Sequence, residues 1–126
     1  PMPLMHTHGD ADPIVPYAGG PGPEWLTPAG YQPPQFPSAD AETAAFAMKN
    51  GCGASTSTFS MGDASCITYG SCDNDASVVR CDVRGGGHAW PGGGSMGVQG
   101  LLLGSQSSAL PTTQMMLDFL KAHRLP

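Results

Sequence analysis

The chain alternates short apolar runs with long stretches that are polar or rich in glycine. Runs rich in apolar and β-branched residues predict short strands. These runs occupy residues 3–8, 56–60, 67–69 and 77–84. Apolar residues at helical spacing predict two helices, over 38–50 and 113–123. The first helix carries a predicted core stripe of Ala41, Ala44, Ala45 and Met48. Strands that alternate with helices in this way predict the α/β class.

One long segment, residues 18–37, fits neither pattern. It holds six prolines and four glycines, which prevent regular structure. We therefore expect an irregular excursion over the surface, pinned by Trp25, Tyr31 and Phe36. A loop of this length is either one wall of a binding cleft or a variable insertion, and the sequence leaves both interpretations open.

Composition and charge exclude several partners. The chain has 18 glycines and 13 prolines among 126 residues, so its core is expected to be thin. Its net charge is −5 and its five Lys and Arg residues are scattered, which argues against nucleic acid or an anionic membrane as a partner. The apolar runs are too short to span a bilayer. No signal peptide opens the chain, so we expect that a leader has been removed or that the sequence begins within a domain.

Four cysteines lie in one window of thirty residues: Cys52, Cys66, Cys72 and Cys81. Their even number and their clustering predict disulfides and an oxidising location, either secreted and extracellular or periplasmic. Their spacing does not fit the paired cysteines of a zinc site. Three pairings are possible. We favour the nested one, Cys52–Cys81 around Cys66–Cys72, because a short loop closes easily inside a longer one.

The most unusual stretch follows the last predicted strand, at residues 85–94, where six glycines bracket His88. Glycine adopts positive φ and allows backbone to approach closely, at a cost in chain entropy. Trp90 and Pro91 stiffen the stretch where a flexible linker would carry serine. We therefore interpret it as a loop built to present His88 as a proton acceptor, against the alternative of a surface loop with an incidental histidine.

A second candidate, Asp12, follows the first predicted strand. Loops at the carboxyl ends of strands carry the sites of α/β proteins, so Asp12 and His88 are expected at one edge. His6, His8, Asp10 and Asp12 also suggest a metal site. We do not favour it, because alternate strand residues face opposite sides and His8 should not reach the loop carboxylates. No metal or cofactor is expected.

Three motifs carry a resemblance to a known family. They are the segments 8–20 (HGDADPIVPYAGG), 50–52 (NGC) and 85–93 (GGGHAWPGG). In this order they resemble secreted esterases of the polyhydroxybutyrate depolymerase-like group, which includes feruloyl and acetylxylan esterases. The resemblance implies an α/β-hydrolase fold with a mostly parallel sheet. It also implies that residues 1–126 are the C-terminal half of one catalytic domain, whose N-terminal half carries the nucleophile.

The resemblance also implies roles for single residues. Asp12 matches the acid that orients the imidazole, and His88 matches the base that activates a serine. Asp10 stands where the family often has a small or hydroxyl residue, and Ala89 where it often has threonine. Tyr17 and Trp90 flank the catalytic positions and are candidate substrate contacts, or they simply pack the loops. The implied substrate is an ester on a plant polysaccharide or a polyester, and the implied partner is the N-terminal half of the domain.

One serine matches the nucleophile motif but is rejected. Gly93-Gly94-Ser95-Met96-Gly97 fits G-x-S-x-G. That motif requires a strand before it and a helix after it, whereas Ser95 lies among glycines and follows the histidine. We therefore expect the nucleophile and the oxyanion donors outside this sequence.

The competing interpretation is a secreted polysaccharide-binding module without catalytic activity, which would use Trp25, Tyr31 and Trp90. Such a module requires a self-sufficient core, whereas half of a hydrolase would leave a strand edge open.

Overall fold

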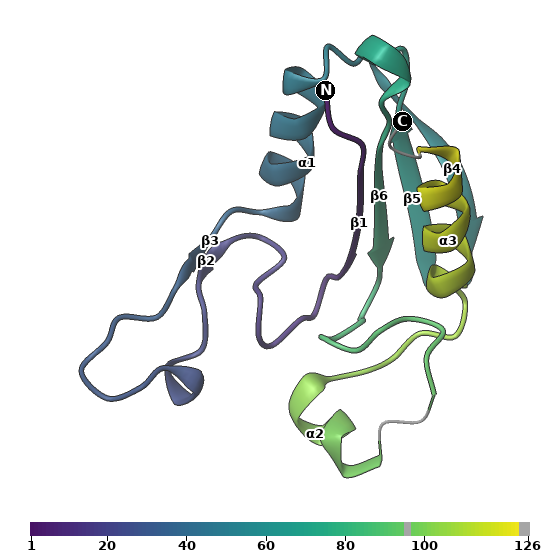
Figure 1. Cartoon of the computed structure of the whole chain (residues 1–126). Helices are drawn as coiled ribbons and strands as arrows, with labels where there is room; N and C mark the ends of the chain where they lie inside the picture. Colours follow the sequence, from purple (N-terminus) through teal and green to yellow (C-terminus); the bar gives the residue numbers. More distant parts are fainter. Residues whose placement is uncertain (95–96, 124–126) are drawn as a thin grey trace.

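The computed structural model describes residues 1–94 and 97–123. Its centre is a four-stranded sheet in the order β1-β6-β5-β4 (Figure 1). The strands are β1 (Leu4–Gly9), β4 (Ser55–Met61), β5 (Ala64–Tyr69) and β6 (Val78–Val83). Only β1 and β6 are parallel, whereas β5 pairs antiparallel with both β4 and β6. The sheet is therefore mixed rather than mostly parallel, because a two-residue turn returns the chain from β4 to β5 and a loop over residues 70–77 returns it from β5 to β6.

Helices cover both faces of the sheet, which places the chain in the α/β class (Figure 1). Helix α1 (Ala39–Lys49) packs against β1 and β6. Helix α3 (Thr112–Ala122) packs against the other face of β1, where Met5, Thr7 and Met116 line one small cavity. The remaining helical pieces are short: α2 (Gly100–Leu103) and the 3₁₀ turns Glu24–Leu26, Asp73–Asp75 and Gly97–Gln99. None of the helices described in 1–94 and 97–123 is long and apolar enough to cross a membrane.

Helix α1 begins and ends as its sequence predicts, but it buries a different face. Ser38 Oγ accepts a hydrogen bond from the Ala41 amide, and Gly51 after the helix has a φ of +64°. The predicted core stripe is wrong: the residues buried are Ala39, Thr43 and Ala47, and Met48 of the stripe is 78% exposed. Thr43 can enter the core because its hydroxyl donates to the Ala39 carbonyl, which satisfies the polar group within the helix.

The core is thin and contains a disulfide. Its central cluster of buried side chains is Ala64, Cys66, Cys81, Val83 and Leu110. Cys66 bonds to Cys81, its direct partner in the antiparallel register of β5 and β6. The second disulfide joins Cys52, after α1, to Cys72, after β5. Disulfides are thus confirmed, but the nested pairing of Cys52 with Cys81 and Cys66 with Cys72 is wrong, because strand register and not loop length decides which cysteines meet.

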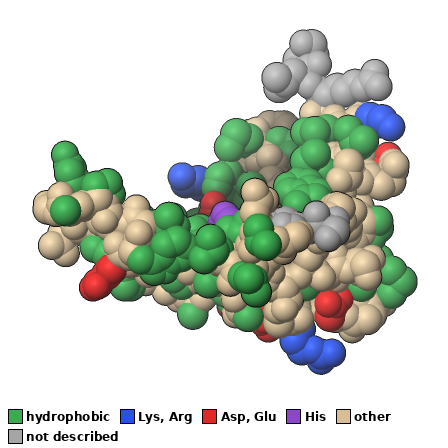
Figure 2. Space-filling model, turned by 90° about the horizontal axis from the view of Figure 1, so that it is seen from below, with side chains coloured by type: hydrophobic (Ala, Val, Ile, Leu, Met, Phe, Trp, Pro, Cys, Tyr) green, Lys and Arg blue, Asp and Glu red, His purple; other side chains and the backbone are tan. Residues whose placement is uncertain are grey.

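Residues 18–37 form an arm that extends away from the sheet, and hydrophobic side chains gather on it (Figures 1 and 2). Its base is a two-residue antiparallel pairing of β2 (Gly20–Pro21) with β3 (Gln35–Phe36). Trp25 and Tyr31 are 60% and 74% exposed, so the expectation that they pin the arm is wrong.

Strand β1 lies at one edge of the sheet. Within the described part of the chain, its outer backbone edge has no ladder partner, although the strand itself is half-buried between α1 and α3. An open edge next to covered faces is a ready template for a further strand.

The disulfide in the core is expected to contribute strongly to stability. Replacing Cys66 and Cys81 together by alanine should lower the free energy of unfolding by about 3 kcal/mol, because the bridge closes a 15-residue loop. Urea unfolding of the protein and its variant measures the difference. Peptide mapping without reduction should recover Cys66–Cys81 and Cys52–Cys72, and a Cys52–Cys81 peptide would contradict the assignment.

Candidate active site

The parallel pairing of β1 with β6 brings two loops to one edge of the sheet. The register ends with Gly9 opposite Val83, so the chain leaves both strands at the same level. The Ala11 amide then donates to the Gly86 carbonyl at 3.0 Å, which joins the two loops directly. A Cβ atom at Gly9 would lie 2.2 Å from the Gly86 oxygen, so only glycine permits this approach.

The loop that carries His88 is held from its other side by residues 103–105. The His88 amide donates to the Leu103 carbonyl at 2.6 Å, and the Gly87 amide donates to Ser105 at 2.7 Å. A Cβ atom at Gly87 would lie 2.1 Å from the Leu103 oxygen. The glycines before His88 therefore allow the loop to contact backbone on two sides. These contacts fix the position of the His88 backbone, from which the imidazole extends.

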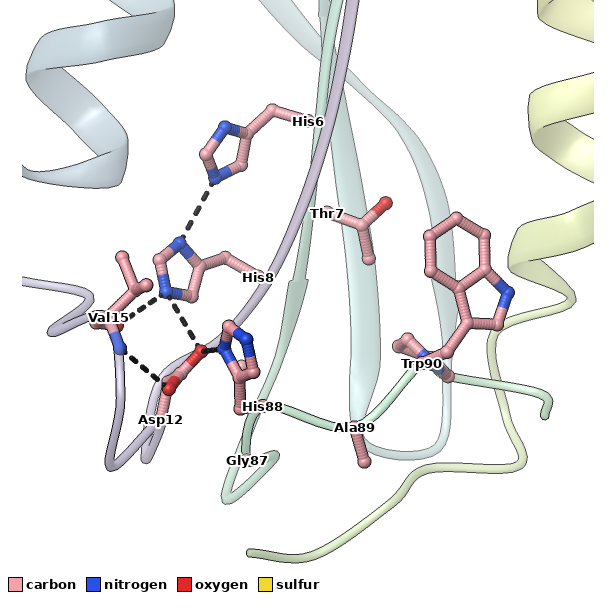
Figure 3. A pocket seen from close by; sticks show the side chains of 11 residues that line it. His6, Thr7, His8, Asp12, Val15, Gly87, His88, Ala89 and Trp90 are labelled. Carbon is pink, nitrogen blue, oxygen red and sulfur yellow. Dashed lines mark hydrogen bonds and ion pairs between the residues drawn. The ribbon is translucent and has the colours of Figure 1, made fainter. Parts of the chain in front are cut away.

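His88 and Asp12 meet side by side (Figure 3). His88 Nδ1 donates to Asp12 Oδ2 at 2.8 Å, and the other ring nitrogen points away from the carboxylate (Figure 3). Asp12 is only 4% exposed, whereas His88 is 42% exposed. The other oxygen, Oδ1, accepts from the amides of Ile14 and Val15 at 2.7 and 2.9 Å. Three donors thus hold the carboxylate in place, and the carboxylate fixes the tautomer of His88 that leaves Nε2 free to take a proton.

Asp10 does not share this contact. Its Oδ1 accepts a hydrogen bond from the Gly85 amide, at the start of the glycine loop. Of the two aspartates that follow β1, Asp12 therefore faces the imidazole, and Asp10 braces the loop.

The two residues open onto a cleft of about 320 Å³. Its other side chains include His6, Thr7, His8, Val15 and Trp90. Trp90 crosses the mouth toward α3, where its Nε1 donates to Thr113 Oγ1 at 3.0 Å. The cleft runs along β1, so its long wall is the open strand edge.

Tyr17, the second expected substrate contact, is absent from the lining of this cleft. Its ring lies edge-on against His8, with 5.5 Å between centroids. Burial, followed by the charge of Asp82, raises the pKa of Tyr17 to about 12, so its hydroxyl stays protonated. The structure therefore places Trp90 at the site and Tyr17 behind it, against the face covered by α1.

Two further histidines lie behind Asp12, and the sequence interpretation had assigned them no catalytic role. His8 Nε2 lies 2.8 Å from the Val15 carbonyl and 3.5 Å from Asp12 Oδ2. His6 Nε2 lies 3.1 Å from His8 Nδ1, and His6 Nδ1 lies 3.3 Å from Glu42 Oε2. Burial lowers the pKa of His6, although Glu42 opposes the shift.

The argument that His8 cannot reach the loop carboxylates is wrong, because the Asp12 turn folds back under the strand onto the face that carries His8. No group of three or more His, Cys, Asp or Glu side chains among the described residues is arranged to hold a metal ion.

A short apolar segment next to the His88 loop was not recognised from the sequence. Val98, Leu101 and Leu102 lie in the turn Gly97–Gln99 and in α2, and all three are exposed. The run Leu101-Leu102-Leu103 was the signal available, but four residues are too few for periodicity to reveal a helix. Ser95, the rejected elbow-like serine, lies outside the described residues.

Comparison with known proteins links the chain to esterases. No family model matches the sequence, and no solved structure matches it. A curated protein of Nocardia uniformis subsp. tsuyamanensis, described as "Putative esterase NocK", is 32% identical over 137 aligned positions. The alignment covers 95% of this chain but 37% of that protein, so the chain spans little more than a third of its relative's length. The chain is a distant, partial homologue of that protein, which supports an esterase-like relationship.

The tight contact at Gly87 can be tested by adding one methyl group. Gly87→Ala should lower the free energy of unfolding by about 1–3 kcal/mol, because the Cβ would overlap the Leu103 carbonyl and force the loop apart. Gly94→Ala is the matched control in the same loop. It has open space around its Cβ and should change stability by less than about 0.5 kcal/mol. Equal effects of the two changes in urea unfolding would contradict the described packing.

Proposed function

We propose that this chain is part of a serine carboxylic ester hydrolase with an α/β-hydrolase fold, and that it supplies the acid and the base of a Ser-His-Asp triad. The observation that carries the proposal is the 2.8 Å bond between His88 Nδ1 and the buried Asp12 carboxylate, at the ends of two adjacent parallel strands. The partial similarity to a protein described as an esterase supports the reaction class. The strand-end position supports the fold, because these hydrolases carry the acid and then the histidine in loops that follow strands.

In the proposed reaction, His88 Nε2 accepts the hydroxyl proton of a serine as its Oγ attacks the ester carbonyl. The imidazolium that forms is stabilised by Asp12 across the Nδ1–H bond. It then gives its proton to the departing alkoxide, which leaves as the alcohol and leaves the acyl group on the serine. A water molecule repeats the cycle: His88 takes its proton, the hydroxyl attacks the acyl carbonyl, and serine regains the proton as the carboxylic acid departs.

The serine and the oxyanion donors belong, in this proposal, to an N-terminal half of the same domain, of which residues 1–126 form the C-terminal half. Two observations support this division. The open outer edge of β1 is where a neighbouring strand of a larger sheet would pair. The chain also corresponds to only 37% of the length of its relative.

For substrate, we propose an ester on a plant polysaccharide or a polyester, cleaved outside the cell. Two disulfides are compatible with an extracellular or secreted protein. Trp90 lines the cleft beside His88, and an indole there is suited to stacking on a sugar ring or an aromatic acyl group.

A second candidate is a polysaccharide-binding module without catalytic activity. The exposure of Trp25 and Tyr31 on the arm favours it. Trp90, the third aromatic residue of that interpretation, is instead bonded to Thr113 of α3, and α3 and the arm lie on opposite sides of β1 (Figure 1). Binding to insoluble polysaccharide that is lost in Trp25→Ala, without any ester hydrolysis, would favour this candidate.

The triad assignment predicts a large and selective effect of Asp12→Asn. In the full-length gene product, this change should lower kcat for a chromogenic ester by about 10⁴-fold, because an amide can leave His88 in the wrong tautomer. Asp10→Asn is the matched control, since its carboxylate bonds to Gly85 and not to the imidazole, and it should cost about tenfold at most. Equal losses for the two variants would contradict the assignment.

The position of the nucleophile gives a second test. A fluorophosphonate probe should label one serine of the full-length gene product outside residues 1–126, and His88→Ala should abolish labelling because the serine is no longer activated. The 126-residue chain alone should neither react with the probe nor hydrolyse esters. Labelling at Ser95, with turnover that disappears in Ser95→Ala, would overturn the proposed division of the triad.

A further inference from the structure

A line of four side chains begins at Asp12, the proposed catalytic acid, and runs along the face of β1 that α1 covers. Figure 3 shows His6 and His8 stacked on this face, with Asp12 and His88 below them. Their rings lie with centroids 5.3 Å apart. The line runs from Asp12 through His8 and His6 to Glu42 of α1, with separations of 3.5, 3.1 and 3.3 Å. The pair of histidines is mostly buried, and Glu42 at the far end is partly exposed.

The hydrogen-bond partners decide where the protons in this line reside. The Val15 carbonyl can only accept, so His8 Nε2 must carry a hydrogen. In the neutral form of His8, Nδ1 is then an acceptor, and the contact at 3.1 Å requires His6 Nε2–H to donate to it. His6 Nδ1 is left facing the Glu42 carboxylate. A further proton can therefore be added at His6 Nδ1, beside Glu42, without breaking the hydrogen bond between the two rings. A proton on His8 Nδ1 would break that bond.

The identity of the protonated ring matters because His8 lies beside Asp12. An imidazolium at His8 would place a positive charge 3.5 Å from Asp12 Oδ2, the oxygen that accepts from His88. It would compete with the His88 imidazolium for the same carboxylate and weaken the base during the reaction. A neutral His8 does not compete.

We propose that His6 is a positioning residue for the Asp12–His88 pair: by donating to Nδ1 of His8 it keeps His8 neutral, so that Asp12 serves His88 alone. This role rests on the proposed esterase function. His6 acts through His8, and its outer nitrogen, Nδ1, faces Glu42. The consequence is that loss of His6 should impair the Asp12–His88 pair more at pH 6 than at pH 8.

The charged and titratable groups around this line come from three elements. Glu42 faces His6 from α1, and Arg80 and Asp82 face it from β6. Tyr17 packs edge-on against His8, and its raised pKa keeps it uncharged. Arg80 is bonded to Asp82 and to Asp40, so its charge is already compensated. Among the described residues, the nearest anion to His6 that has no other cation bonded to it is therefore Glu42, at the end of the line remote from Asp12.

The first measurement is spectroscopic and requires no turnover. Long-range ¹H–¹⁵N spectra of the full-length gene product, labelled in its histidine rings and assigned by single replacements, report which nitrogens carry protons. At neutral pH, His8 should show a protonated Nε2 and a bare Nδ1. In His6→Phe, which keeps an aromatic ring but no donor, His8 Nδ1 should gain a proton at a higher pH than in the parent.

The second measurement separates kcat from KM as a function of pH. At pH 6, His6→Phe should lower kcat about tenfold with KM within about twofold, and at pH 8 the loss should shrink to about twofold. His6→Gln offers an amide N–H to His8 and should restore kcat at pH 6 to within about twofold of the parent. His123→Gln, at the end of α3, is the control and should leave the profile unchanged.

Two results would overturn the proposal. One is a parent His8 that carries its proton on Nδ1 or is doubly protonated at neutral pH. The other is a His6→Phe variant whose His8 signals and pH profile match those of the parent. If the parent hydrolyses no ester at any pH, the proposed function fails, and the ring spectra still decide whether His6 holds His8 neutral.

Discussion

The site depends on the pairing of β1 with β6. These strands are remote in sequence, yet their parallel register ends with Gly9 opposite Val83, which brings the Asp12 turn and the His88 loop to one edge. The close approach of the two loops requires glycine at Gly9, where a Cβ atom would overlap the Gly86 carbonyl oxygen. Gly87 is required on the other side of the His88 loop, where a Cβ atom would overlap the Leu103 carbonyl oxygen. A shift of one residue in this register would turn the side chains of β1 to the opposite face and carry His8 away from Asp12.

The Asp12 carboxylate has a structural role and a proposed catalytic role at the same time. Its two oxygens receive two backbone amides from its own turn and the Nδ1–H of His88, while His8 lies close behind. The charge is buried at little cost because each oxygen has donors. The core beneath this site is small, and it contains the disulfide that joins the neighbouring strands β5 and β6. We infer that covalent bonds stabilise β6, and with it the His88 loop, where apolar contacts are few.

The sequence predicted those features that depend on local chemistry. Strand β1 and helix α1 with its Ser38 cap follow from short patterns. The expectation that loops at strand ends share one edge placed Asp12 near His88, and the structure shows the two side chains bonded. The disulfide pairing, by contrast, depends on the β5–β6 register, which no spacing rule contains. The buried face of α1 was predicted wrongly because Thr43 satisfies its own hydroxyl and packs as an apolar residue. The line from Asp12 to Glu42 was missed because it needs a turn that folds back under the strand and a helix placed over it, and neither can be seen in a linear pattern.

The central claim is that His88 serves a serine supplied from outside these 126 residues. The most direct test is the crystal structure of the full-length gene product after inactivation by a phosphonate ester, with the distance from His88 Nε2 to the modified oxygen as the measured quantity. The account predicts a serine Oγ outside this sequence within about 3 Å of His88 Nε2, with the Asp12 bond intact. A modified serine remote from His88, or an imidazole turned away from Asp12, would contradict it.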